Sequence, residues 1–466
     1  MGDGSQLIHN ISPLDELSKS HFNSLIVGGG IVGAGILRDL ALHDVDTLLL
    51  EKKDFSSQTS QSSSKMLHGG IRYLENLDFA LVYEALHEKN LWIKLAPHLA
   101  KAEKFYLPVY SDSLRPLWMV RAGIFLYDFL SSFQNLSRGF ATKDETLDAL
   151  KFIRSKGLKG AGIYSDAIVD DGKLTLEVIM DSLECPNALA ISYIDVSVTK
   201  KLSDGHYECL ATDELTGVQK VLTCENLIIA TGPFTDHFMN KINFLEWEDV
   251  LLPSKGSHIW LDRKDFDLHS PVLLTPNDGR VIFVIPHDNR VLVGTTEVAV
   301  EEDYFDVKPT QEEIDYLLEN LMDFFPDANI TKDKILGSFA GIRPLVKEDS
   351  TLNKGKTARE HKVIQPDNGM FVIVGGKYTT FRTMAQDITA QVIRRQHLSY
   401  NPNKTKQPLR KKCQHNFFNR PEVTVEVLED IISNELPRTY EDIEKRRMLT
   451  NDFKEVMQKY YQKHTL

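Results

Sequence analysis

Three glycines spaced as Gly28-x-Gly30-x-x-Gly33 could bring a phosphate group against the main chain of this protein. They follow an apolar run and open a stretch with helical apolar spacing, so a phosphate would meet the positive end of a helix. Glu51 ends the next apolar run, where a carboxylate can accept hydrogen bonds from a ribose diol and would repel a 2′-phosphate. This order of strand, glycines, helix, strand and acid predicts a dinucleotide site at Gly28, Gly30, Ile31, Gly33 and Glu51.

A polar stretch over 52–70 helps to choose between the two common dinucleotides. A nicotinamide-dependent enzyme usually continues into further strand–helix units, whereas this chain enters a run of hydroxyl, amide and lysine side chains. FAD is longer than a nucleotide crevice and needs such donors along its pyrophosphate and ribityl chain, so we expect FAD. A solvated serine-rich linker is the alternative, but the sequence His-Gly-Gly-Ile-Arg-Tyr-Leu that follows is not typical of linkers. The expected cofactor contacts in this stretch are Thr59, Ser63, Ser64, Lys65, His68 and Gly69.

Four basic residues stand in segments marked by glycine or proline, namely Arg72, Arg343, Arg359 and Lys377. Arg72 and Arg343 are flanked by apolar residues, which indicates side chains that are at least half-buried and need an anion. A structural ion pair with a core carboxylate is the alternative for any one of them. Together the four cations favour a small anionic substrate, with phosphate preferred over carboxylate because guanidinium binds phosphate in a bidentate way.

Composition restricts the classes of function open to the chain. Its 466 residues predict two large lobes and a small appendage, and its net charge of −12 argues against a general nucleic-acid-binding protein. The four cysteines lack metal-ligand spacing and indicate scattered thiols in a reducing compartment. No apolar run reaches the ~18 residues of a membrane span. The segment 117–130 is expected to be a core-facing helix, with an interfacial membrane helix as the alternative.

The chain also resembles a known family over roughly residues 22–390. The resemblance is carried by "GGGIVGAG" (28–35), "TSQSSSKMLHGGIRYLE" (59–75), "LIIATGPFTD" (227–236), "SKGSHIWL" (254–261), "SFAGIRPLV" (338–346) and "MFVIVGGKYTTFRTMAQDI" (370–388). These motifs look like those of the FAD-dependent glycerol-3-phosphate dehydrogenases, which belong to the wider superfamily of D-amino-acid-oxidase-like flavoproteins.

The resemblance implies roles for individual side chains. His258 is the first candidate for the base that accepts the substrate hydroxyl proton, and His68 is the second. Gly232, Gly376 and Lys377 would approach the flavin closely. The residues expected to bind the substrate are Arg72, Tyr73, Ser257, His258, Arg343, Arg359 and Lys377. The residues expected to act in catalysis are His258, Arg343, Lys377 and Arg72.

The fold implied by the resemblance is α/β. A Rossmann-like FAD-binding domain of the D-amino-acid-oxidase type would be interleaved with an α+β substrate domain of mixed antiparallel sheet. The expected segments are 22–110, 155–235 and 335–395 for the FAD-binding domain, 111–154 and 236–334 for the substrate domain, and 396–466 for a short helical C-terminal region. This last region is shorter than the C-terminal helical domain that many family members carry.

Three local patterns complete the organisation of the chain. Thr310 and Glu313 form a capping pair that predicts a helix over 310–326. The basic run 403–412 is expected to be a solvated linker, with contact to anionic lipid head groups as the alternative. The segment 440–448 looks like a remnant of the C-terminal helical motif of the family.

The activity implied by the resemblance is oxidation of sn-glycerol 3-phosphate to dihydroxyacetone phosphate, by hydride transfer from C2 to flavin N5. Electrons would pass to a quinone. The alternatives are an oxidase that uses oxygen, an amine or amino-acid oxidase of the same fold, and a catalytically silent flavoprotein. The resemblance implies a cytoplasmic location and allows peripheral contact with the cytoplasmic face of a membrane and a homodimer. Neither a metal site nor a nucleic-acid partner is expected.

Overall fold

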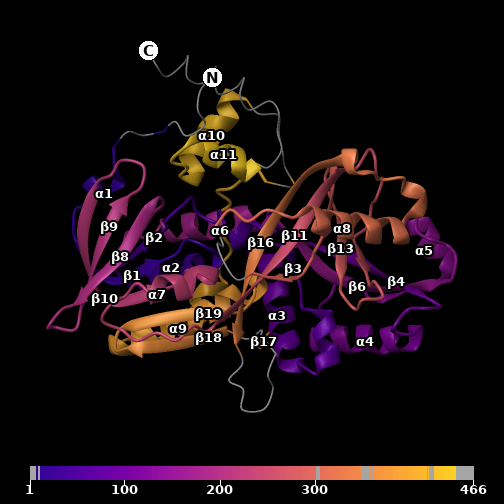
Figure 1. Ribbon diagram of the computed structural model, residues 1–466. Coiled ribbons are helices and arrows are strands. Elements are labelled where there is room, and N and C mark those ends of the chain that lie inside the picture. The colour runs from indigo at the N-terminus through magenta and orange to yellow at the C-terminus, as the bar shows by residue number, and fades with distance from the viewer. Residues whose placement is uncertain are drawn as a thin grey trace. The chain divides into compact units, whose positions relative to one another are not determined.

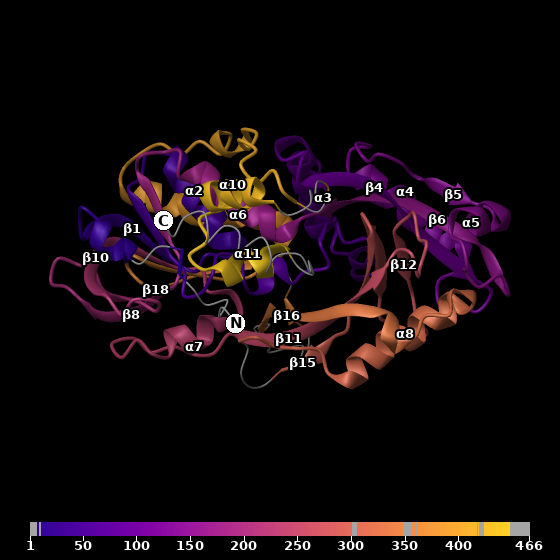
Figure 2. The same cartoon turned by 90° about the horizontal axis from the view of Figure 1, so that it is seen from above.

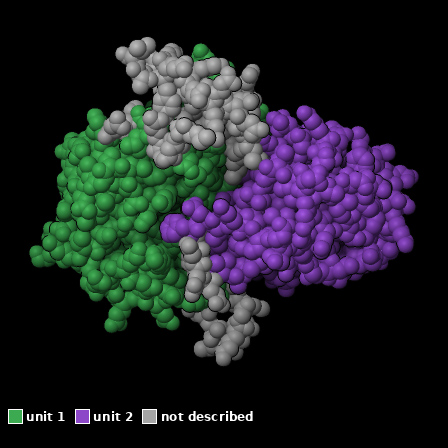
Figure 3. Space-filling view, turned by 45° about the horizontal axis from the view of Figure 1, so that its top comes forward, with its two compact units in different colours: residues 1–61, 171–253, 344–466 green, residues 62–170, 254–343 purple. Residues whose placement is uncertain are grey.

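The computed structural model describes residues 7–8, 11–300, 305–347, 357–358, 361–416, 418 and 424–447. The chain divides into two compact units, and each is built from segments that are separate in the sequence (Figure 3). Unit 1 comprises 1–61, 171–253 and 344–466, and unit 2 comprises 62–170 and 254–343. Both units are discontinuous in the sequence, and their boundaries differ from the predicted ones.

Two of these differences have a clear structural reason. Residues 62–110 belong to unit 2, because β3 (Met66–Leu67) and β4 (Ala100–Tyr110) both pair antiparallel with β6 (Leu158–Val169). The described part of the C-terminal region belongs to unit 1, because its side chains form buried ion pairs within that unit. Both arrangements depend on contacts between distant parts of the sequence, which local patterns do not reveal.

Unit 1 contains a mainly parallel sheet in the strand order β18-β19-β10-β1-β2-β7. Figure 1 labels β18, β19, β10, β1 and β2 of this sheet, and Figure 2 shows β18, β10 and β1 from above. Strands β19, β10, β1, β2 and β7 run parallel, and β18 pairs antiparallel with β19. Strands β8 and β9 extend from β10 as an antiparallel addition. The strand bounds are β1 His21–Val27, β2 Thr47–Leu50, β7 Ala188–Ile191, β8 Ile194–Lys201, β9 Tyr207–Asp213, β10 Gln219–Ile229, β17 Thr357–Ala358, β18 His361–Asp367 and β19 Met370–Gly375.

The glycine-rich segment leads into helix α2 of unit 1, as predicted. Helix α2 packs against α6 and α9, and most of its residues are buried. The helix bounds are α1 Pro13–Glu16, α2 Ile31–Leu42, α6 Asp171–Ser182, α7 Thr235–Met239, α9 Phe381–Arg395, α10 Val425–Glu435 and α11 Tyr440–Arg447, with 3-10 turns η1 Thr59–Gln61, η3 Gly232–Phe234, η6 Tyr378–Thr380 and η7 Lys404–Lys406.

A second sheet has the strand order β17-β16-β11-β14-β13-β12-β4-β6-β3, and β5 and β15 pair with β6 and β11. Most of it lies in unit 2, where a buried apolar cluster joins its strands to α8. The further bounds are β5 Gly139–Ala141, β11 Leu251–Asp262, β12 Val272–Leu274, β13 Ile282–His287, β14 Arg290–Gly294, β15 Val298–Ala299, β16 Ile335–Lys347, η2 Ile71–Asn76, α3 Phe79–Leu95, α4 Leu117–Leu130, α5 Lys143–Ala149, α8 Gln311–Phe324, η4 Pro326–Ala328 and η5 Lys332–Lys334.

Two predicted helices of unit 2 are confirmed. Helix α8 begins after the capping pair of Thr310 and Glu313, in which each residue bonds the main chain of the other. Helix α4 buries Val120, Ile124 and Tyr127, as expected for a core-facing helix, but its opposite side is exposed and apolar.

Three further observations bear on the predicted classes of function. In the part of the chain that the structure describes, no helix is long and apolar enough to cross a membrane. No group of His, Cys, Asp and Glu in that part could hold a metal ion. In the basic run 403–412, Arg410 and Lys412 both pair with Glu184, so this segment is tied to the end of α6 and is not a free linker.

Candidate functional site

The parallel sheet of unit 1 brings most of the predicted cofactor residues to one edge. The carboxyl ends of adjacent parallel strands lie at the same edge of a sheet, where ligands of such folds bind. Residues that lie within three positions after the ends of β1, β2, β10 and β19 are Gly28, Glu51, Gly232, Gly376 and Lys377. The structure therefore places on one sheet edge residues that are up to 349 positions apart, from Gly28 to Lys377.

Two glycines of the loop after β1 cannot carry a side chain. Gly28 has a φ of +113°, and a Cβ atom there would lie 2.4 Å from the carbonyl oxygen of Ala230. A Cβ atom on Gly33 would lie 1.9 Å from the carbonyl oxygen of Gly28. The tight turn and the close helix–strand packing expected from the spacing are both present.

The start of α2 contains a contact that the sequence pattern did not reveal. Gly30 precedes the helix, and the main-chain N–H of Ile31 donates a hydrogen bond of 2.9 Å to Ser60 Oγ. Ser60 lies in the serine-rich run beside the predicted Thr59, and no feature of the sequence distinguished it from its neighbours. Its hydroxyl occupies the helix end at which a pyrophosphate oxygen would be bound.

Glu51 lies at the end of β2 with its carboxylate held by the main chain. It accepts hydrogen bonds of 2.6 Å from Gly29 N–H and 2.8 Å from Lys53 N–H. Burial raises the pKa of Glu51 to about 6, despite these hydrogen bonds, which act in the opposite direction. A glycine loop without Cβ atoms, a helix N-terminus and an oriented carboxylate fit the pyrophosphate and ribose of a dinucleotide.

Unit 2 forms a second cluster around His258, on β11. His258 Nε2 lies 2.9 Å from Ser64 Oγ, and its ring is stacked on Phe339 of β16 with centroids 4.8 Å apart. The Lys65 ammonium lies 5.4 Å from the centroid of the same phenyl ring. The hydroxyl-rich loop predicted to line the cofactor thus contacts the residue predicted to be the base. Phe339 was not predicted, because one phenylalanine in an apolar strand carries no functional signal.

The surroundings of His258 keep its imidazole neutral. Burial holds the pKa of His258 well below its usual value, and the positive charges of Arg343 and Lys65 lower the pKa further. His258 Nδ1 is buried and has no hydrogen-bond partner in the described part of the chain. A neutral, positioned imidazole can accept a proton at neutral pH.

Arg343 lies in the same cluster and is anchored by the segment after β14. Its Nη2 donates to Thr295 Oγ1 at 2.9 Å and to the carbonyl oxygen of Thr296 at 3.3 Å. Glycines make room for both key side chains. A Cβ atom on Gly256 would lie 2.4 Å from Arg343 Nη2, and one on Gly294 would lie 2.1 Å from His258 Cδ2.

Ser257 is separated from this cluster by the alternation of side chains along β11. It is fully buried, and its hydroxyl donates a hydrogen bond of 2.9 Å to Glu313 Oε1. The same carboxylate accepts from Thr296 Oγ1 at 2.9 Å and pairs with Lys255. Glu313 therefore links β11 to the Thr295–Thr296 segment. The predicted contact of Ser257 with substrate stays a prediction.

The loop that contains His68 and Gly69 is fixed by a buried polar network. Gly69 N–H donates to Tyr127 Oη at 2.9 Å, and Tyr127 in turn donates to Asp166 Oδ1 at 2.7 Å. Lys89 is buried beside Asp166, with 3.5 Å between its Nζ and Oδ1. This network was not foreseen, because its members come from α3, α4 and β6. His68 is half-buried, and its ring centroid lies 6.4 Å from that of Phe283.

The remaining predicted residues differ in burial and in their contacts. Arg72 is exposed, so the inference that apolar neighbours indicate a half-buried side chain is wrong for this residue. Tyr73 packs its ring against Gly70, Ser63 Oγ accepts from Lys65 N–H at 2.9 Å, and Lys377 is half-buried after β19. Arg359 lies outside the described residues.

Comparison with known proteins identifies the family. The family model described as "FAD dependent oxidoreductase" (DAO) matches residues 24–385. The aerobic glycerol-3-phosphate dehydrogenase of Bacillus subtilis is 31% identical over 80% of this chain and 67% of its own length. A probable mitochondrial glycerol-3-phosphate dehydrogenase of Caenorhabditis elegans is 33% identical over 82% of this chain, which spans only 54% of that relative.

A solved structure agrees with these sequence relatives. The glycerol-3-phosphate dehydrogenase of Bacillus halodurans, complexed with FAD, superposes with a TM-score of 0.68 at 27% identity, covering 84% of this chain and 68% of that one. The region matched by the family model, residues 24–385, includes the glycine loop of unit 1 and the His258 cluster of unit 2. The chain therefore belongs to the FAD-dependent oxidoreductases of the DAO family and, within them, to the FAD-dependent glycerol-3-phosphate dehydrogenases.

Proposed function

We propose that this protein oxidises sn-glycerol 3-phosphate at C2 to dihydroxyacetone phosphate. The observation that carries the proposal is the cluster of unit 2, in which a neutral, buried His258 lies beside the positive charges of Arg343 and Lys65. A base with cations beside it suits a substrate that has a hydroxyl to deprotonate and a phosphate to bind. The names of the sequence relatives support the same substrate.

The chain's own residues supply proton transfer and binding in this proposal. His258 accepts the proton of the C2 hydroxyl, because burial and the adjacent cations keep its imidazole unprotonated. Arg343 binds the phosphate and, with Lys65, stabilises the negative charge that develops on the C2 oxygen. The chemistry that FAD would supply when bound is acceptance of the hydride from C2. The unit 1 residues at the sheet edge, with Glu51 on the ribose, would hold FAD.

The proposed activity can be tested with the purified, FAD-loaded protein and an artificial dye as electron acceptor. We expect dye reduction with sn-glycerol 3-phosphate and none with glycine or sarcosine, with little peroxide formed in air. Rapid oxygen uptake would instead make the protein an oxidase. Dye reduction by glycine or sarcosine alone would support an amine oxidase of the same fold and would reject the phosphate substrate.

The affinity for FAD should depend on pH through Glu51. Burial raises the pKa of Glu51 to about 6 in the absence of ligand, whereas ribose hydroxyls that donate to the carboxylate would lower it. FAD binding then releases a proton from Glu51. The affinity for FAD is therefore highest above about pH 6 and falls as the pH decreases below that value. Titration of the deflavinated protein with FAD at several pH values measures this. Glu51→Gln should flatten the dependence, and an equally steep fall in that variant would exclude Glu51 as its source.

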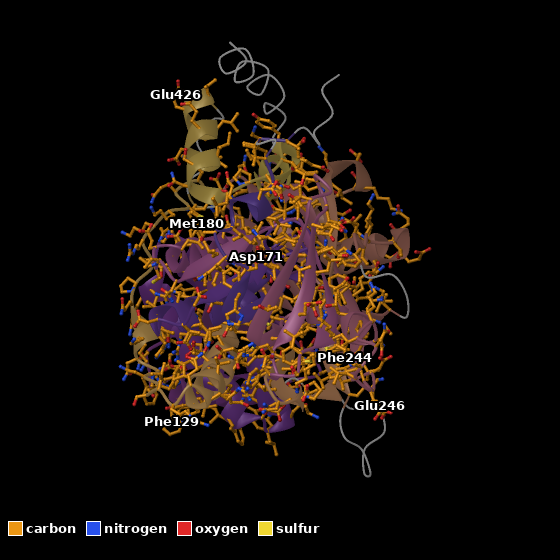
Figure 4. All side chains as sticks on the ribbon, turned by 90° about the vertical axis from the view of Figure 1, so that its left-hand side faces the viewer. Phe129, Asp171, Met180, Phe244, Glu246 and Glu426 are labelled. Carbon is orange, nitrogen blue, oxygen red and sulfur yellow. The ribbon has the colours of Figure 1, made fainter. Side chains whose placement is uncertain are left out.

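Helix α4 supports a further part of the proposal, contact with a membrane that holds the electron-accepting quinone. Trp118, Phe125 and Phe129 are 70%, 60% and 56% exposed, and their spacing places them on one side of the helix. Figure 4 labels Phe129, which lies at the outer edge in that view. Phe133, just beyond the helix, is 52% exposed. Large apolar side chains gathered on one exposed side mark an interaction surface, and aromatic side chains suit a lipid interface.

Replacing Trp118, Phe125 and Phe129 with serine should lower binding to phospholipid vesicles by roughly tenfold or more, because about 25 cal/mol is lost per Å² of apolar surface no longer buried. Co-sedimentation with vesicles measures the bound fraction. A matched variant replaces three exposed apolar residues of unit 1, Val221, Phe244 and Leu398, with serine. Equal loss in both variants, or in neither, would contradict a specific membrane contact through α4.

A further inference from the structure

We propose that the C-terminal helices α10 and α11 act as a clamp on the adenosine end of the FAD site, with Arg446 and Asp442 as positioning residues. The proposal rests on FAD binding by unit 1 and does not depend on the identity of the substrate. All the residues involved lie in unit 1. The segment that resembled a remnant of a longer domain would thus have a defined role in holding the cofactor.

The first contact of the clamp joins Arg446 to Asp54. The guanidinium donates from Nε to Asp54 Oδ2 at 2.7 Å and from Nη2 to Oδ1 at 2.5 Å, a bidentate pair between residues 392 positions apart. Both side chains are buried, with exposures of 3% and 7%. Two parallel hydrogen bonds fix the orientation of both groups, and a buried charge that loses its partner is strongly destabilising.

Asp54 belongs to the segment that supports the glycine loop. It lies three positions after Glu51. The next two residues contact Gly29 directly: Ser56 N–H donates to the Gly29 carbonyl oxygen at 3.0 Å, and a Cβ atom on Gly29 would lie 2.7 Å from the Phe55 ring. Displacement of Asp54 would therefore shift both the phosphate-binding loop and the carboxylate expected to bind the ribose.

The second contact reaches the same segment through Tyr193. The Tyr193 hydroxyl donates a short hydrogen bond to Asp442 of α11. Tyr193 N–H donates to the Lys53 carbonyl oxygen at 3.0 Å, and the next N–H, that of Ile194, donates to the Glu51 carbonyl oxygen at 2.7 Å. Helix α11 thus holds the Glu51–Asp54 segment both directly, through Arg446, and indirectly, through Tyr193.

The helices of the clamp are themselves anchored to unit 1 by buried charges. Glu435, at the end of α10, pairs with Lys173 of α6 at 2.5 Å, and its carbonyl oxygen accepts from Arg446 Nη1 at 2.8 Å. Arg438, between the two helices, pairs with the buried Asp213 at 2.9 Å. These contacts give α11 a fixed position from which to order the Glu51–Asp54 segment before the cofactor binds.

The test is the dissociation constant of FAD for the deflavinated full chain, measured by flavin fluorescence. Arg446→Met keeps the length of the side chain but removes the bidentate pair, and we expect it to weaken FAD binding roughly tenfold or more, which corresponds to about 1.4 kcal/mol. Lys445→Met is the matched control, because Lys445 is the exposed neighbour on the same helix, and it should bind FAD as the wild type does. At saturating FAD the two variants should reduce dye at equal rates.

Unchanged FAD affinity in a folded Arg446→Met protein would overturn the proposal, even if that variant unfolded at a lower temperature, because a purely structural ion pair would give that result. If Arg446→Met does not fold, Tyr193→Phe decides, since it removes only the hydroxyl that donates to Asp442. A several-fold weaker affinity then supports the clamp, and wild-type affinity rejects it. A wild-type protein inactive on glycerol phosphate would refute the proposed substrate but not the clamp, because the FAD measurement needs no substrate.

Discussion

Replacing His258 with glutamine should lower kcat with sn-glycerol 3-phosphate by about 10²- to 10⁴-fold, the usual contribution of a general base. Glutamine approximates the size and polarity of the imidazole but cannot accept the hydroxyl proton. The affinity for FAD and KM should change little, because the phosphate ligand Arg343 and the unit 1 residues remain. Steady-state dye reduction, together with FAD titration of the deflavinated protein, separates these quantities.

A suitable control is His287→Gln, because His287 is a buried histidine of the same sheet, on β13. It should keep kcat near the wild-type value. A kcat for His258→Gln close to that of this control would exclude His258 as the base and would turn attention to His68, the second candidate. A loss of FAD together with activity would assign His258 a structural role in cofactor binding instead.

Replacing Arg343 with methionine should raise KM for sn-glycerol 3-phosphate by about 10- to 100-fold, the cost of losing hydrogen bonds to a charged group. The same change should move the acid limb of kcat/KM to higher pH. Arg343 is one of the charges that hold the pKa of His258 below its usual value, so its removal lets that pKa rise. Because protonated His258 cannot act as a base, activity should then be lost at a higher pH than in the wild type.

The pH profiles of wild type and Arg343→Met measure this shift directly, since the titration of the substrate phosphate is common to both. Arg343→Lys keeps the charge but not the bidentate geometry. Its acid limb should therefore lie close to that of the wild type, whereas its KM for sn-glycerol 3-phosphate should lie between those of the wild type and Arg343→Met. An unchanged KM in Arg343→Met would contradict the assignment of Arg343 to the phosphate. An unchanged acid limb would show that Arg343 does not set the protonation of the base.

The parts of the fold and site that could be predicted are those that local sequence spacing determines. The glycine loop is the clearest example, because a Cβ atom on Gly28 or Gly33 would clash with main-chain atoms. The start of α8 is another, because the hydrogen bonds of its capping pair involve only nearby residues. Arg343 was singled out by its charge between apolar residues and His258 by resemblance, and the structure places both in one cluster.

The parts that could not be predicted depend on contacts between distant segments. Phe339 and Asp166 have no local feature that sets them apart, and each gains its importance from partners on other strands and helices. The same holds for Arg446, whose partner Asp54 is 392 positions away. For Arg72 the local pattern led to a wrong prediction. Its apolar neighbours indicated a half-buried side chain, whereas in the short turn η2 the side chain is exposed.

The most direct test of the central claim is anaerobic mixing of the FAD-loaded protein with sn-glycerol 3-phosphate while the flavin absorbance is followed. We expect the oxidised flavin absorbance to disappear in a single turnover, with one equivalent of dihydroxyacetone phosphate formed per flavin. Glycerol, which lacks the phosphate that Arg343 would bind, should reduce the flavin far more slowly. A flavin that stays oxidised with sn-glycerol 3-phosphate, or that glycerol reduces equally fast, would contradict the proposed activity.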